Sequence, residues 1–107
     1  MVKSQAVQFP DRLYAIAERI KSAYHAERVI LYGSYARGEA TRDSDVDVLV
    51  IAPTQERFLQ RMATVRGAIR DLRKGLPVSP IVLTPAELQE REGDAFVRSI
   101  LEEGIEL

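Results

Sequence analysis

The sequence contains no cysteine and no tryptophan, and its formal net charge is only −1. Without cysteine the chain can form neither a disulfide framework nor a thiolate metal site, which suits a reducing cytoplasm. A balanced charge gives no broad positive field, so we expect no strong direct binding to nucleic acid and no attraction to an anionic membrane. No apolar run approaches the roughly 20 residues that span a bilayer, and the N-terminus lacks a signal-peptide pattern. These absences predict a cytoplasmic protein.

The composition that remains is that of an ordinary globular protein, with 46% hydrophobic residues in a chain of 107. A chain near this length buries roughly two thirds of its unfolded surface, which is enough for a core. There is no internal repeat and no long linker after the polar segment at residues 1–9. We therefore expect residues 1–107 to form a single domain.

Hydrophobic periodicity predicts helices and strands that alternate along the chain. The last three helices are expected to be capped by Thr54, Thr84 and Asp94. The arginines of the long third helix, including Arg61, lie off its apolar stripe. The lone histidine, His25, is interpreted as a solvated residue at a helix end, with a catalytic base as the alternative. The expected helices cover residues 10–25, 35–39, 54–72 and 84–91 and a last segment from residue 94 to Gly104, and the expected strands cover residues 28–32, 45–51 and 78–83.

The chemistry is concentrated in residues 29–51, where an apolar strand, a Gly-Ser turn, a polar segment and a second apolar strand follow one another. Side chains two apart on a strand share a face, so Asp45 and Asp47 should point the same way and can share hard cations through oxygen. Gly33 lets the backbone approach a ligand, and Ser34 offers a hydroxyl and an N–H group. Helix N–H groups starting here would favour phosphate. The pattern predicts a nucleoside triphosphate site with bound metal.

This site also predicts the topology. The end of the first strand, at Gly33 and Ser34, must meet the start of the second, at Asp45 and Asp47, so these strands should run antiparallel. The long helix between the second and third strands suits a parallel crossover. The predicted fold class is therefore α/β of the α+β type, a small mixed sheet packed by helices. The competing interpretation is a polar loop whose aspartates are merely solvated.

This stretch resembles the minimal nucleotidyltransferases of the DNA polymerase β-like superfamily, and a weaker likeness at residues 84–87 and 103–107 extends the resemblance over most of the chain. The residues that carry it are Gly33, Ser34, Tyr35, Ala36, Arg37, Gly38, Ser44, Asp45 and Asp47.

The resemblance implies a role for each part of the motif. Gly33 and Ser34 would hold the triphosphate of ATP, while Asp45 and Asp47 would be the catalytic ligands of two Mg²⁺ ions. Arg37 and Ser44 complete the expected nucleotide-binding set. Arg37 is equally well explained as a solvated helix arginine, and Ser44 as the cap of its loop.

One departure from the family concerns a third carboxylate, which its members often carry on the next strand. Counting back from Thr84, the expected position is occupied by Ser79. A serine hydroxyl is a poor metal ligand and a weak base at neutral pH. Glu39, Asp43 and Glu87 are possible substitutes, although none of them lies on that strand.

Family members of this size resemble the antitoxin half of toxin–antitoxin pairs, whose partner is a helical HEPN-type ribonuclease toxin. The resemblance implies a hetero-oligomer in which the antitoxin transfers AMP from ATP to a toxin tyrosine (AMPylation). The alternative is a catalytically weak or inactive nucleotidyltransferase fold that neutralises the toxin by complex formation. A third possibility, nucleotide transfer to a drug or RNA, would require a separate subunit to hold the acceptor. The apolar segments 96–101 and 105–107 either contact a partner or complete the domain's own core.

Overall fold

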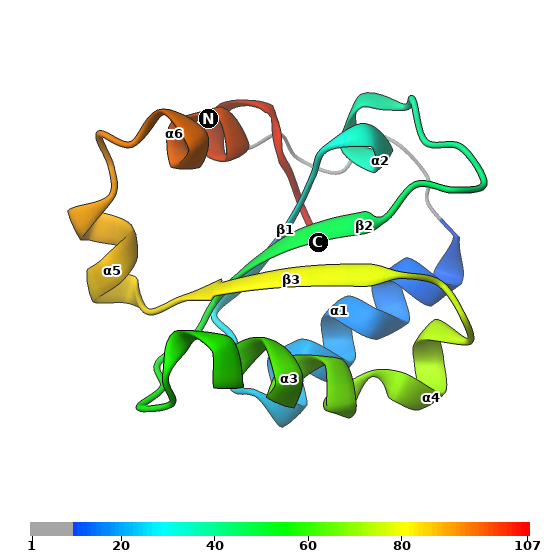
Figure 1. Ribbon diagram of the computed structural model, residues 1–107, viewed down its shortest axis with the longest axis horizontal. Coiled ribbons are helices and arrows are strands. Elements are labelled where there is room, and N and C mark those ends of the chain that lie inside the picture. Colours follow the sequence, from blue (N-terminus) through cyan, green and yellow to red (C-terminus); the bar gives the residue numbers. More distant parts are fainter. Residues whose placement is uncertain (1–9) are drawn as a thin grey trace.

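The computed structural model describes residues 10–107, in which four strands form one mixed sheet with helices on both faces (Figure 1). The strand order is β3-β2-β1-β4; β1 is antiparallel to both β2 and β4, whereas β2 and β3 are parallel. This confirms the predicted fold class and strand directions. The polar segment predicted at residues 1–9 lies outside the described residues. The strands are β1 (Arg28–Tyr32), β2 (Val46–Ile51), β3 (Val78–Leu83) and β4 (Ile105–Glu106).

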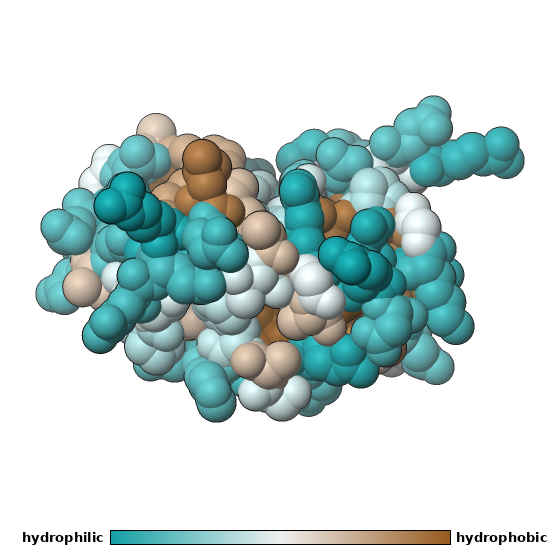
Figure 2. All heavy atoms as spheres, turned by 60° about the horizontal axis from the view of Figure 1, so that its bottom comes forward, coloured by the Kyte–Doolittle hydropathy of each residue, from teal (hydrophilic) through white to brown (hydrophobic). Residues whose placement is uncertain are grey.

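The helices divide between the two faces of the sheet (Figure 1). α1, α3 and α4 cover one face, α5 and α6 lie on the other, and the short α2 follows the end of β1. The surface over α1, α3 and α4 is largely hydrophilic (Figure 2). Within the described part of the chain, no helix is both long and apolar enough to cross a membrane. The helices are α1 (Asp11–Ala23), α2 (Ser34–Arg37), α3 (Phe58–Ala68), α4 (Arg70–Arg73), α5 (Pro85–Glu90) and α6 (Ala95–Glu103).

The central strand β2 separates two hydrophobic cores, because successive side chains of a strand point to opposite faces. Val48 and Val50 pack into the larger core with α1 and α3, whereas Leu49 and Ile51 pack into the smaller core with α6. All four side chains are buried. The nearly continuous apolar run of β2 is therefore explained by cover on both faces.

The long third helix predicted at residues 54–72 is wrong in its start and in its continuity. The Thr54 hydroxyl accepts the N–H of Glu56 at 3.1 Å, which closes a turn instead of capping a helix. α3 begins only at Phe58, without a side-chain cap. The helix is interrupted at Ile69, whose N–H bonds the carbonyl of Arg66 three residues back. The buried Ile69 side chain thus sits at a tight bend between α3 and α4.

Arg61 is buried, although it was placed off the apolar stripe. Its guanidinium forms a bidentate ion pair with Glu87 at 2.6 and 3.1 Å and donates to the Val82 carbonyl at 3.1 Å. Glu87 also accepts the N–H of Thr84 in the predicted capping box of α5. The hydrogen bonds from Arg61, and secondly that from the Thr84 backbone, lower the pKa of Glu87 to about 2. The pair clamps α5 against α3 at the end of the edge strand β3.

The C-terminal segment forms β4 and completes the domain's own core. Ile105 is buried, and the N–H of Leu107 donates to the Val29 carbonyl at 2.8 Å. A Cβ at Gly104 would lie 2.5 Å from both the Ile100 carbonyl oxygen and the side chain of Ile30, so only glycine lets the chain turn here from α6 into the sheet. The α6 N-cap is Asp94, as predicted.

Replacing Glu87 by Gln should destabilise the fold by about 3 kcal/mol near neutral pH, because it leaves the buried Arg61 charge without its counter-ion. The folded-state pKa of Glu87 lies below its ordinary value of 4.5, so the wild-type advantage should be present above pH 4.5 and disappear toward about pH 2. Chemical denaturation at several pH values measures both effects. Glu90→Gln, on the exposed side of the same helix, is the control and should change the unfolding free energy by less than about 0.5 kcal/mol. An equal loss of unfolding free energy in both variants would contradict a stabilising role for the Arg61–Glu87 ion pair.

Candidate functional site

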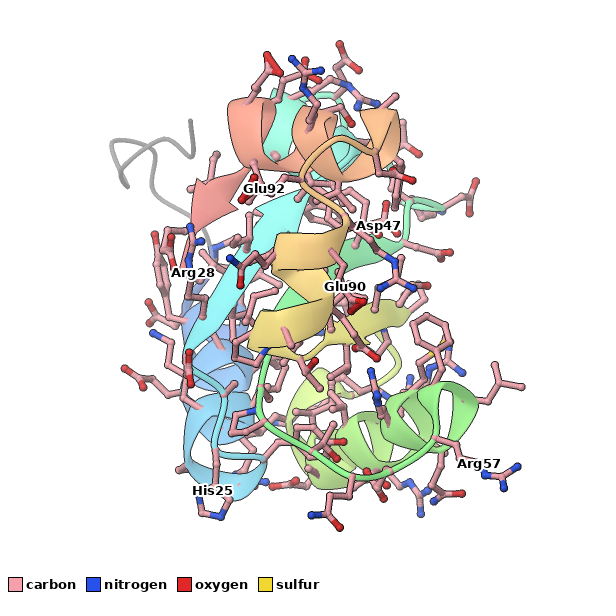
Figure 3. All side chains as sticks on the ribbon, turned by 90° about the vertical axis from the view of Figure 1, so that its left-hand side faces the viewer. His25, Arg28, Asp47, Arg57, Glu90 and Glu92 are labelled. Carbon is pink, nitrogen blue, oxygen red and sulfur yellow. The ribbon has the colours of Figure 1, made fainter. Side chains whose placement is uncertain are left out.

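The sheet register brings Tyr32, Asp47 and Ser79 into one row. Asp47 is the pairing partner of Tyr32 on β1 and of Ser79 on β3. Since Leu49 and Ile51 point into the smaller core with α6, Asp47 points to that side as well. Figure 3 shows Asp47 on the α6 side of the sheet. Ser79 therefore occupies the place beside Asp47 at which the third carboxylate was expected.

Gly33 lies directly against the Asp47 carboxylate. It caps α2 with φ +75°, and a Cβ built on it would lie 2.5 Å from Asp47 Oδ2. Ser34 begins α2, one residue earlier than predicted, and Gly38 ends the helix in the left-handed conformation. In the described part of the chain the Ser34 hydroxyl forms no hydrogen bond. The glycine and serine thus form an open backbone corner beside a carboxylate.

The two aspartates form an acidic pair whose charges act on each other. Burial, and secondly the negative charge of Asp45, raises the pKa of Asp47, while Arg37 opposes this shift. Asp45 is exposed and precedes the first residue of β2, although the prediction had placed it inside the strand. Among residues 10–107, no side chain donates a hydrogen bond or an ion pair to either carboxylate.

This donor set fits a hard divalent cation, which would relieve the repulsion between the two carboxylates. The described residues contain no group of three or more His, Cys, Asp or Glu side chains that could hold a metal. A metal bound by Asp45 and Asp47 would therefore complete its coordination with water and ligand oxygens.

Arg37 and Ser44 lie near the acidic pair but are already engaged. Arg37 is exposed and donates to Glu39 at 2.8 Å, while its charge acts on Asp47. The Ser44 hydroxyl accepts the N–H of Thr41 at 2.8 Å, and this bond closes the loop before β2. The geometry thus gives Ser44 the loop-cap role that was its alternative interpretation.

None of the three substitutes proposed for the missing acid lies beside Asp47 on β3. Glu87 is held by Arg61 and Glu39 pairs with Arg37, whereas Asp43 is exposed in the loop before the acidic pair.

The catalytic alternative for His25 finds no support in the structure. His25 is exposed after α1, at the far end of the molecule from Asp47 (Figure 3). This placement agrees with its interpretation as a solvated residue at a helix end.

Sequence reasoning missed the contribution of Tyr32 and α6. Burial, and secondly the charge of Asp47, raises the pKa of Tyr32 to about 12. Its ring meets that of Phe96 edge to face, with centroids 5.8 Å apart and planes at 85°. The only signal in the sequence was the position of Tyr32 directly before the Gly-Ser turn; nothing indicated that α6 would return to this point.

A cavity of about 220 Å³, here named the α2–α6 cavity, opens beside this corner. Its walls include Tyr32 and Gly33 from the end of β1 and its turn, Arg37 from α2, and Phe96, Ser99 and Glu103 from α6.

Known proteins are similar to this chain in sequence and in architecture. A provisionally named protein adenylyltransferase of Methanocaldococcus jannaschii is 31% identical over 87 residues, which cover 79% of this chain and 83% of that protein. Another from the same organism is 38% identical over 76 residues, covering 68% of this chain and 52% of that protein, so the chain matches about half of that relative's length. A crystal structure of a provisionally assigned nucleotidyltransferase from Sulfolobus solfataricus superposes with a TM-score of 0.60 at 26% identity, covering 90% of this chain and 76% of that one.

The family itself is identified by a match over nearly the whole described chain. The model of the nucleotidyltransferase domain family covers residues 13–107, which include the Gly-Ser corner, the acidic pair and the returning strand β4. The polymerase β-like fold expected from the motif agrees with the four-stranded mixed sheet and with the Sulfolobus structure. The chain therefore belongs to the nucleotidyltransferase domain family.

Proposed function

We propose that this protein is an adenylyltransferase that transfers AMP from ATP to a tyrosine hydroxyl of a partner protein. The observation that carries the proposal is the contact between Gly33 and Asp47, because it joins a phosphate-binding corner and an acidic pair in one site. The names of the Methanocaldococcus relatives support a protein as the acceptor.

The chain's own residues would divide the work between phosphate binding and metal binding. The backbone at Gly33 and the free hydroxyl of Ser34 would hold the triphosphate, and Asp45 and Asp47 would hold two Mg²⁺ ions. Such ions supply charge neutralisation and lower the pKa of an attacking hydroxyl. The acceptor oxygen forms a bond to the α-phosphorus, the bond to the bridging oxygen of the β-phosphate breaks, pyrophosphate leaves, and the hydroxyl proton passes to water. Arg37 is close enough to Asp47 to offset phosphate charge after leaving Glu39.

The proposed acceptor is a HEPN-type ribonuclease toxin, which this protein would neutralise as an antitoxin within a cytoplasmic hetero-oligomer. The motif at residues 33–47 supports this proposal through its resemblance to antitoxins of this size.

A second candidate function is neutralisation by complex formation alone. It is favoured by Ser79, which places a hydroxyl beside Asp47 where a third carboxylate would serve as metal ligand or base. Nucleotide and metal binding need only the corner and the acidic pair, whereas rapid turnover also needs the acceptor hydroxyl to be activated.

The direct test combines the protein with ATP, Mg²⁺ and the candidate toxin and follows the toxin's mass. Wild type should add one or more adenylyl groups, and Asp45→Asn or Asp47→Asn should lower the rate by at least about a hundredfold, because each removes a charged metal ligand. Asp43→Asn, in the exposed loop just before Asp45, is the control and should retain the wild-type rate. The absence of any adenylyl addition by wild type would refute the transferase proposal.

Growth protection in cells separates the two candidate functions. If transfer neutralises the toxin, Asp47→Asn should lose protection while the complex still forms. If the complex alone neutralises, the variant should protect as well as wild type.

Gly33→Ala should weaken binding of Mg·ATP by at least about tenfold, because the new Cβ displaces the Asp47 carboxylate. The matched control is Gly38→Ala, which has nearly the same φ (+73° against +75°) but no atom within 4 Å of the added Cβ. Gly38→Ala should lose about 1 to 2 kcal/mol of stability from its left-handed backbone. Gly33→Ala should lose more, because its ψ of −153° lies in a region essentially restricted to glycine, and only this variant should lose affinity. Calorimetric titration measures the affinities, and equal affinity in both variants would contradict the proposed role of the corner.

Ser79→Asp should increase the rate of AMP transfer by about tenfold or more, since it supplies a carboxylate beside Asp47 on the same face. Ser79→Asn provides a side chain of the same shape without the charge and should not increase the rate. Initial rates at saturating Mg²⁺ measure the effect. An unchanged rate in the aspartate variant would show that activation of the acceptor does not depend on this position.

A further inference from the structure

The α2–α6 cavity and the acidic pair lie on either side of Gly33. This residue lines the cavity, and its Cβ direction points at Asp47 Oδ2. A nucleotide whose phosphates follow the corner at Gly33 and Ser34 therefore has the cavity within reach of its nucleoside. The volume of about 220 Å³ is smaller than the roughly 300 to 1,000 Å³ of pockets that enclose a whole ligand, so the cavity suits one part of a nucleotide.

The apolar part of the cavity presents aromatic surface. Phe96 is 52% exposed, and its ring meets that of Tyr32 edge to face. A ring that is both fixed and exposed can stack on a planar heterocycle at little entropic cost. Ile100 and Ala36 provide apolar contact beside it.

The polar part of the cavity offers hydrogen-bond acceptors at its α6 wall. Glu103 carries a carboxylate that forms no hydrogen bond within the described residues, and it lines the cavity together with Arg37 of α2. The Ser99 hydroxyl already donates to the Phe96 carbonyl at 2.8 Å. Glu103 is therefore the acceptor best placed for a ligand that donates N–H groups.

We propose that the α2–α6 cavity receives the base of the donor nucleotide, with Phe96 stacking on the ring and the Glu103 carboxylate accepting a hydrogen bond from the exocyclic amino group. This inference rests on the proposed function and adds a reason why an amino-bearing purine such as adenine is selected. An ionised carboxylate can only accept hydrogen bonds, so the Glu103 carboxylate favours a base that donates one.

Calorimetry in the presence of Mg²⁺ tests the polar contact by comparing ATP with purine riboside 5′-triphosphate, which lacks only the amino group. Wild type should bind ATP roughly tenfold more tightly, since a hydrogen bond to a charged group is lost with the analogue. Glu103→Ala should remove the difference. Glu102→Ala is the control on the same helix, outside the cavity, and should keep the difference.

The stacking contact has its own matched pair of variants. Phe96→Ala should weaken ATP binding roughly tenfold and leave the binding of inorganic tripolyphosphate unchanged. Phe58→Ala removes another exposed phenylalanine, 43% exposed and outside the cavity, and should affect neither ligand.

The outcomes separate this inference from the proposed function. The base site is overturned if wild type binds ATP and the analogue equally well, or if Glu103→Ala still binds ATP more tightly than the analogue. If the protein still binds tripolyphosphate in that case, the proposed phosphate binding at Gly33 and Ser34 stands. A protein that binds neither tripolyphosphate nor ATP with Mg²⁺ overturns both.

Discussion

The antiparallel pairing of β1 with β2 is the constraint on which the site depends. It sets Tyr32 opposite Asp47, so the next residue of the chain turns directly over the Asp47 carboxylate. Only glycine fits there, since the backbone is left-handed and no room exists for a Cβ. The approach of Gly33 to the Asp47 carboxylate is thus fixed by the backbone hydrogen bonds between β1 and β2. A site built on rigid strands in this way is preorganised before any ligand arrives.

The two faces of the sheet contribute differently. The face under α1, α3 and α4 is sealed by the larger core, while the buried Arg61 and Glu87 pair fastens α5 to α3. The other face is covered mainly by α6, whose Val97 and Ile100 are buried while its Phe96 remains half exposed. This incomplete cover leaves Asp47 and the neighbouring cavity accessible. The larger core therefore lies on one face of the sheet and the candidate site on the other.

Ser79 is the position at which this chain departs from the three carboxylates expected of the site. The parallel register holds it next to Asp47, so its position is right for a third ligand, whereas its hydroxyl lacks the charge that a metal or a proton would use. The chain matches the nucleotidyltransferase domain family over residues 13–107. In the proposed function, the two carboxylates would bind the metal and the nucleotide, and the residue at position 79 would set the rate of transfer.

The sequence by itself determined the strands and most helix ends, because alternation, helical spacing and capping are local rules. It also located Ser79 beside the acidic pair. Tertiary structure alone decided the burial of Arg61, the return of residues 105–106 as an edge strand and the cavity that α6 forms with Tyr32. Each of these depends on segments that are far apart in the chain, and no local pattern records which of them will meet.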